Sequence, residues 1–260
     1  MTKGGEKAPQ TREDRHDSAP IGEATQRIAA RVAGWILLLL MASGFTGMFA
    51  FGANPIVDGD AVATAQNVLA HERAFRGSLA CEIIMLNCDV VLALALYALL
   101  KPLNGTLALL GSFWRIANAG VLAVGVAASL VALDLFSNPN YMSLLNASQL
   151  HPTALIFFDL HDRLSLMGLM SFCLGAGVHS WLLYRSRYIP RIISGLCLFA
   201  CIEMLLCCFT FLIFPKLREV FDPAFVVPDA LAELFATLWL AIKGVKLPAR
   251  AKETSSELVI

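Results

Sequence analysis

Long apolar runs separated by polar segments make up most of this chain. Most of them reach the roughly 20 residues that a helix needs to cross a bilayer. The runs lie at residues 32–51, 78–100, 106–130, within 151–184, and at 190–214 and 229–242. Because a spanning segment must pair its backbone groups internally, each run is expected to be a helix. The pattern predicts an all-α membrane protein, a bundle of about six transmembrane helices.

Polar breaks set the boundaries of these spans. KPLNG at 101–105 is a short turn, so the second and third spans should be antiparallel neighbours. His151-Pro152 is expected to open the long helix that carries the fourth span, and Pro190 suits the first position of the fifth. The other breaks are expected at 53–77, which includes a short interfacial helix, at 137–149 and at 215–228.

The two ends of the chain have a different composition from the middle. Residues 1–28 mix Gly, Pro, Ser and charges with almost no apolar periodicity, so they are expected to form a disordered tail. Residues 29–246 form the predicted transmembrane domain. Residues 247–260 are polar and are expected to form a second unstructured tail.

The overall composition agrees with a membrane protein. Of the 260 residues, 57% are hydrophobic and only 15% are charged, which is far more apolar than a water-soluble domain. The 20 basic and 20 acidic residues cancel, so the chain lacks the broad positive potential of a nucleic-acid-binding protein. Membrane lipids are therefore the expected partners, and no nucleic acid is expected.

The distribution of Lys and Arg predicts the orientation. With six spans and the N-terminus inside, fourteen of these residues fall on the inner side and five on the outer side. Because basic residues favour the cytoplasmic side, both termini are predicted to be cytoplasmic, in the inner (plasma) membrane.

Seven cysteines lie inside the predicted spans, away from loops where a disulfide framework would form. Cys197, Cys201 and Cys208 share one helical face, so a soft-metal site is one interpretation. No loop supplies a CxxC or His partner, and packing of small buried residues is favoured. No metal and no cofactor are predicted.

Five ionisable residues stand at depths where a charge is costly, so they should face protein or water. They are Glu82, Asp89, Arg115, Glu203 and Glu233. Glu82 and Asp89 are two turns apart on one face, separated by about 10 Å of helical rise. Carboxyls buried without a full set of partners can exchange protons near neutral pH. The hairpin of the second and third spans is therefore the first place to look for function.

The register of that hairpin predicts a specific pair. Asp89 and Arg115 stand at nearly equal distances from the turn, so their Cα depths should differ by only about 4 Å. We expect them to face each other inside the bundle, with Asn118 as an additional hydrogen-bonding partner. The alternative is that Arg115 extends to the cytoplasmic headgroups and Asp89 lines a separate cavity.

A further polar cluster opens the fourth helical segment. His161 and Asp162 are candidates for a proton-handling pair at the mouth of a cavity. The simpler interpretation is that Asp159 and Arg163, four residues apart, form a salt bridge on one helical face.

Four blocks of sequence together resemble a known family. They are LALALYALLKPLN with LALLGSFWR, LLYRSRYIPRIISGL, and AELFATLWLAIKG. They are similar to a widespread bacterial family of multi-pass membrane proteins, uncharacterised and catalogued as a domain of unknown function. The resemblance covers about residues 33–246 and implies no substrate, cofactor or mechanism. Positions matching its pattern are Asp89, Tyr97, Arg115, Pro190, Arg191, Glu233 and Lys243, whereas His179 looks particular to this chain.

Three functions are compatible with the buried charges. The chain is expected to be a carrier-like protein or a scaffold that interacts with lipid, with a small lipophilic ligand in the bundle as a candidate partner. The alternative is a metal-free acid/base enzyme, an isomerase or cyclase, acting on an isoprenoid or fatty substrate. No HExxH, GxSxG or phosphate-binding glycine loop is present to favour other enzyme classes.

Overall fold

The computed structural model describes residues 18–50, 56–57, 59–140, 146–214 and 218–247. Over this part of the chain it contains seven α-helices and no strand. The elements are α1 (Ser18–Phe45), the short π-helix η1 (Thr46–Ala50), α2 (Ala61–Ala70), α3 (Glu72–Leu100), α4 (Gly105–Ser137), α6 (Ala147–Ser186), α7 (Arg191–Ile213) and α8 (Arg218–Ile242). The prediction of an all-α bundle is confirmed.

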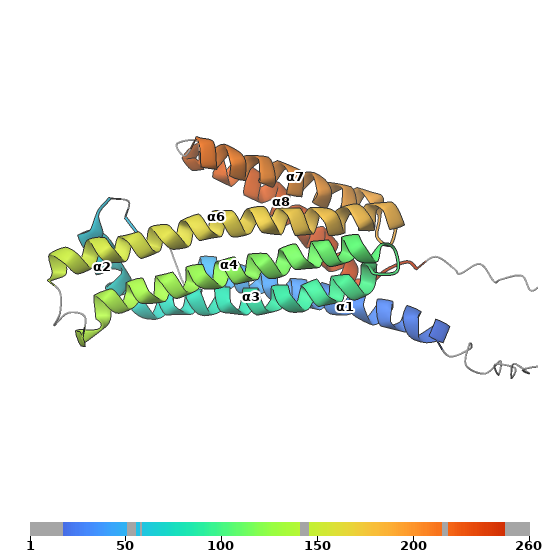
Figure 1. The fold of residues 1–260 in the computed structure, drawn as a ribbon, viewed down its shortest axis with the longest axis horizontal. Helices are drawn as coiled ribbons and strands as arrows, with labels where there is room; N and C mark the ends of the chain where they lie inside the picture. Colours follow the sequence, from blue (N-terminus) through green and yellow to red (C-terminus); the bar gives the residue numbers. More distant parts are fainter. Residues whose placement is uncertain (1–17, 51–55, 58, 141–145, 215–217, 248–260) are drawn as a thin grey trace, which may run out of the picture.

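The six long helices form a closed ring. Each packs on the next in chain order, from α1 through α3, α4, α6 and α7 to α8, and α8 packs back on α1. Figure 1 shows α3, α4 and α6 running along the long axis, with α7 and α8 beyond α6. Gly34 lies where α1 contacts α8, and a Cβ at this position would be only 2.7 Å from the Ala241 Cα on α8. The absence of a side chain lets these two backbones approach closely.

The α3–α4 hairpin has the predicted tight turn. The Lys101 N–H donates to the Tyr97 carbonyl and ends α3, and the Asn104 Oδ1 accepts from the Leu107 N–H at 3.0 Å and caps α4. Asn is among the preferred N-cap residues because its side chain satisfies a free helical N–H. The two helices are antiparallel neighbours, as the sequence predicts.

Both ends of the described chain meet at one end of the bundle. The buried Gln26 of α1 donates to the Leu99 carbonyl at 3.0 Å, beside the α3–α4 turn. Past the end of α8, the Lys246 N–H donates to the carbonyl of Tyr188, in the α6–α7 turn. The start of α1 and the end of α8 therefore lie at the same end, on the right of Figure 1.

Several helices extend beyond the predicted apolar runs, most clearly α1, α6 and α8. Residues 18–28, expected in a disordered tail, are helical, because Gln26, Ala29 and Ala30 pack against the bundle. Residues 218–228, expected in a loop, belong to α8. α6 begins at Ala147 rather than at Pro152, which lies inside the helix. The remaining tail residues, 1–17 and 248–260, lie outside the described residues.

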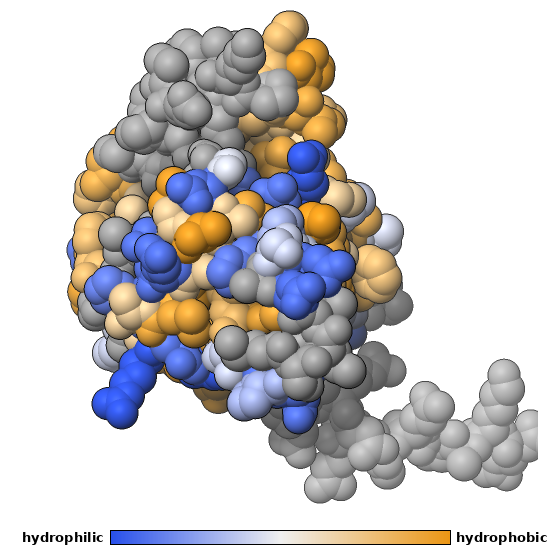
Figure 2. Space-filling model, turned by 90° about the vertical axis from the view of Figure 1, so that its left-hand side faces the viewer, coloured by the Kyte–Doolittle hydropathy of each residue, from blue (hydrophilic) through white to orange (hydrophobic). Residues whose placement is uncertain are grey.

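The sides of the bundle are apolar. Among the described residues, five helical segments are long and apolar enough to cross a membrane, and they overlap α1, α3, α4, α6 and α7, whereas α8, which holds the predicted sixth span, is not one of them. Large apolar side chains stay exposed on them, such as Phe113 (68%) and Ile192 (78%). Figure 2 views the α2 end of the molecule, where hydrophilic residues gather on the end face and hydrophobic residues lie around it. Such apolar sides with polar ends are characteristic of a multi-pass membrane protein.

Candidate functional site

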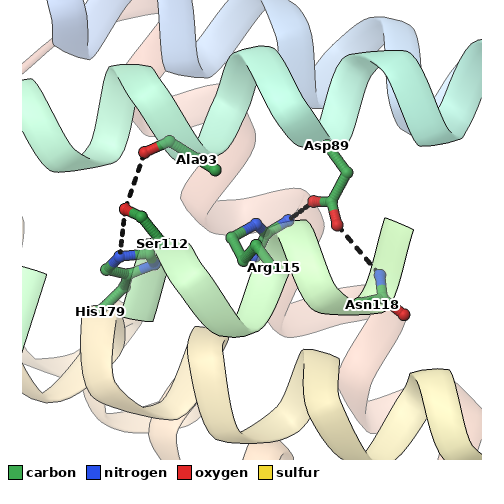
Figure 3. Close-up of polar contacts among 6 residues, drawn as sticks. All are labelled: Asp89, Ala93, Ser112, Arg115, Asn118 and His179. Atoms are coloured by element: carbon green, nitrogen blue, oxygen red, sulfur yellow. Dashed lines mark hydrogen bonds and ion pairs between the residues drawn. The ribbon is translucent and has the colours of Figure 1, made fainter. Parts of the chain in front are cut away.

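Asp89 and Arg115 form a buried ion pair between α3 and α4 (Figure 3). The Arg115 Nη2 meets the Asp89 Oδ1, and the Asn118 Nδ2 donates to the Asp89 Oδ2 at 3.0 Å. All three residues are at least 94% buried. The predicted pair and its predicted partner Asn118 are therefore confirmed, and the alternative in which Arg115 extends to the headgroups is wrong.

Besides its ion pair, the Arg115 guanidinium contacts an aromatic ring and has one unpaired N–H group. The guanidinium carbon lies 5.0 Å from the centroid of the Phe172 ring, in the geometry of a cation–π contact. The Nε–H is buried and has no hydrogen-bond partner among the described residues. Because buried donors are almost always paired, an unsatisfied guanidinium N–H inside a bundle is a candidate contact for a ligand or a water molecule.

A second polar group on the same side of the bundle is His179. The Ser112 hydroxyl donates to the Ala93 carbonyl at 2.8 Å, and the His179 Nε2 lies 3.4 Å from the Ser112 Oγ (Figure 3). The same nitrogen lies 3.4 Å from the Ala108 carbonyl. A Cβ on Gly111 would lie 2.6 Å from the His179 Nε2, so only glycine leaves space for this ring. His179 is 98% buried.

A cavity lies inside the helix ring, and each of the six long helices contributes to its wall. The space in it that a water-sized sphere can occupy is about 80 Å³, and part of the cavity is open to the surroundings. Most of the wall is apolar, with Leu37, Leu96 and Leu240 among its residues. The ionisable residues of the wall are Arg115, His179, Asp229 and Glu233. A mainly apolar pocket with a few polar groups is the usual form of a small-molecule site.

The structure brings together only some of the carboxyls that the sequence predicts inside the bundle. Asp229 and Glu233 lie in the cavity wall with Arg115, which pairs with Asp89. One Glu203 oxygen is buried without a partner among the described residues, and Glu203 is not part of the wall. Asp89, Arg115 and Glu233 are therefore at or beside the cavity, whereas Glu203 lies outside its wall.

Glu82 belongs to a separate site. Its Oε2 lies 3.8 Å from the His161 Nε2, which joins α3 to α6. His161 thus has a contact with Glu82 that the sequence does not predict, and the His161–Asp162 proton-handling pair stays a prediction. Within the described residues, Asp159 and Arg163 do not form the salt bridge that the simpler interpretation expects.

Three residues at or beside the cavity are not among the sites predicted from the sequence. His179 and Asp229 lie in the cavity wall, and Ser112 contacts His179. An ionisable residue inside an apolar run is a usable signal, and His179 in GAGVHSWLL meets that criterion. No sequence signal links it to Ser112, because their contact depends on how α4 packs on α6.

The cysteines serve mainly in packing. Cys173 and Cys208 form a buried cluster with Met204, and the Cys197 Sγ donates to the Ala232 carbonyl at 3.4 Å. Within the described residues, no group of three or more His, Cys, Asp or Glu side chains is placed to hold a metal ion. The structure therefore gives no support to a metal site on the Cys197–Cys208 face.

Most of the chain matches one known protein family. Residues 32–244 match the family described as a domain of unknown function (DUF4386). The chain belongs to this family. The DUF4386 match begins within α1 and ends just after α8, so it contains every residue of the cavity wall and all of the ring except the first part of α1. No characterised protein and no solved structure matches the chain.

Proposed function

We propose that this DUF4386 protein is a carrier-like protein of the inner membrane, which binds a small lipophilic solute in the ring cavity and exchanges protons there. The observation that carries the proposal is the cavity itself, which lies within the bundle and has four ionisable residues in its wall. Ionisable residues at membrane depth usually mark substrate, ion or proton sites.

The unsatisfied polar atoms favour a carrier over a scaffold. Buried charges that only fix helix register need a complete set of partners, since each missing partner costs free energy. Among the described residues, two atoms of cavity-wall residues, the Arg115 Nε and the His179 Nδ1, lack one. A bound solute or water would satisfy these atoms, whereas a purely structural role would not require leaving them unpaired.

The predicted orientation has support from basic residues that pack on aromatic rings at one end of the bundle. Lys101 lies over the Tyr97 ring, and Arg185 over the Trp181 ring. Two similar contacts join Arg191 to Tyr184 and Lys243 to Trp239. All four lie near the turns or helix ends at the end of the bundle where α1 begins. Tyr and Trp are common at both membrane interfaces, whereas Lys and Arg favour the cytoplasmic side, so the four basic residues are what supports this orientation.

The test is retention of a solute. The full chain would be taken from its own membranes into lipid nanodiscs, and the extracted small molecules analysed by mass spectrometry. We expect a compound that co-purifies with the wild type and is lost in Ala236→Phe, which fills the cavity wall. Leu238→Phe, on an exposed position of the same helix outside the wall, should retain it.

Three further outcomes decide between functions. Flux of the identified compound into vesicles, coupled to proton movement and lost in Glu233→Gln, would support the carrier. Chemical conversion of the compound by the purified protein would instead identify the metal-free enzyme. Absence of any retained compound, with both variants folded, would contradict a solute site and favour the scaffold.

A further inference from the structure

The cavity wall contains more strong hydrogen-bond acceptors than donors. Asp229 and Glu233 contribute two carboxylates. Glu233 takes part in none of the salt bridges of the described residues. The charged donor of the wall is Arg115, and its guanidinium already pairs with Asp89. The wall therefore contains two acidic groups that its own cation does not pair with.

His179 adds a further acceptor. Since the Ser112 hydroxyl gives its proton to the Ala93 carbonyl, its oxygen can only accept from the His179 Nε2. The other neighbour of that nitrogen, the Ala108 carbonyl, is also an acceptor. In the neutral ring Nε2 therefore carries the hydrogen, and Nδ1 has a free lone pair. Nδ1 is buried without a partner among the described residues, on a residue of the cavity wall.

These features together define the ligand chemistry. An acceptor nitrogen and two carboxylates in an apolar wall are complementary to a group that donates hydrogen bonds and carries positive charge. A carboxylate ligand would find the Arg115 Nε–H, but it would also meet Asp229 and Glu233. Leu37, Leu96 and Leu240 supply the surface for a hydrocarbon body.

We propose that the ring cavity binds a lipophilic amine in its protonated form, with the ammonium group beside Glu233 and Asp229 and within reach of the His179 Nδ1. This inference rests on the proposed carrier function and names the chemical class of its solute. Binding and release of the amine would then exchange a cation for protons on the carboxyls.

The experiment uses the full chain in nanodiscs of neutral phosphatidylcholine, with empty nanodiscs to subtract partitioning into lipid. Isothermal titration at neutral pH would compare three probes of similar size: 2-phenylethylamine, 2-phenylethanol and 3-phenylpropanoate. The amine should bind at least about 10-fold more tightly than either, because it alone offers a cation to the two carboxylates.

Variants locate the site. Ala236→Phe and Glu233→Gln should each weaken amine binding by about 10-fold or more, the first by filling the cavity and the second by removing one charge. Leu238→Phe should leave the affinity unchanged. Thermal unfolding of each variant shows that it is folded, and Asp229→Asn takes the place of Glu233→Gln if the latter does not fold.

Several results would overturn the inference. Equal binding of amine and alcohol, tighter binding of the acid, or amine binding unchanged in Ala236→Phe would each do so. If the amine fails to bind but a co-purified compound is lost only in Ala236→Phe, the carrier proposal stands with a different solute. If both experiments fail, both proposals fall.

Discussion

Gly111 lies directly against the imidazole of His179, across the contact between α4 and α6. A methyl group at position 111 would come within 2.6 Å of the Nε2 and 2.8 Å of the Cδ2 of the ring. Such distances are shorter than any normal contact, so the ring or the helix must move. The position of His179 in the cavity wall thus depends on a glycine 68 residues earlier in the chain.

Gly111→Ala should therefore destabilise the protein. We expect a loss of about 1–3 kcal/mol, the usual cost of forcing extra volume into a packed site. Gly120→Ala, on the same helix, is the matched control, because a Cβ there meets nothing within 4 Å. It should be neutral or slightly stabilising, since Ala favours helices more than Gly. Thermal unfolding in one detergent would measure both, and equal effects would contradict the contact.

The Asp89–Arg115 pair should show strong coupling. Arg115→Met leaves the Asp89 charge buried without its partner and should cost roughly 3–5 kcal/mol of unfolding free energy. The double variant Asp89→Leu/Arg115→Met should recover much of this loss, because no charge is left stranded. Asn87→Leu, on an exposed position of the same helix, serves as the control and should have little effect. Additive losses in the double variant would show that the two residues are not coupled.

Closure of the ring should depend on Gly34. A side chain there would overlap the backbone of α8 at Leu240 and Ala241, so Gly34→Val should separate α1 from α8. We expect a lower midpoint of thermal unfolding and faster cleavage of α8 by protease. Gly22→Val, where a Cβ meets nothing within 4 Å, controls for the lower helix propensity of Val. Indistinguishable behaviour of the two variants would argue against a close α1–α8 contact.

Reporter fusions test the orientation. A reporter placed after Leu103, in the α3–α4 turn, should report the cytoplasm, because Lys and Arg residues gather at that end. A reporter placed after Asn140, beyond the other end of α4, should report the opposite side. The reverse pattern would refute the orientation drawn from the distribution of Lys and Arg.

The hairpin shows why one part of the site was predictable. Asp89 and Arg115 lie on helices joined by a tight turn, so counting residues from the turn is enough to place them at equal depth. The long apolar runs likewise determine most helix positions, because a bilayer requires an uninterrupted apolar helix of known length. The Glu82–His161 contact was not predictable in this way, since it joins helices that are not consecutive in the chain.

By itself, the sequence determined the membrane class, the positions of five apolar spans, the α3–α4 hairpin and the ion pair within it. These follow from local rules, which are helical rise, turn length and the cost of burying a charge in lipid. Only the tertiary structure decided that α8 closes a ring on α1, that His179 meets Ser112, and that Asp229 and Glu233 share a cavity wall with Arg115. The physical reason is that glycines such as Gly34 and Gly111 set how closely helices approach, and this depends on which surfaces meet.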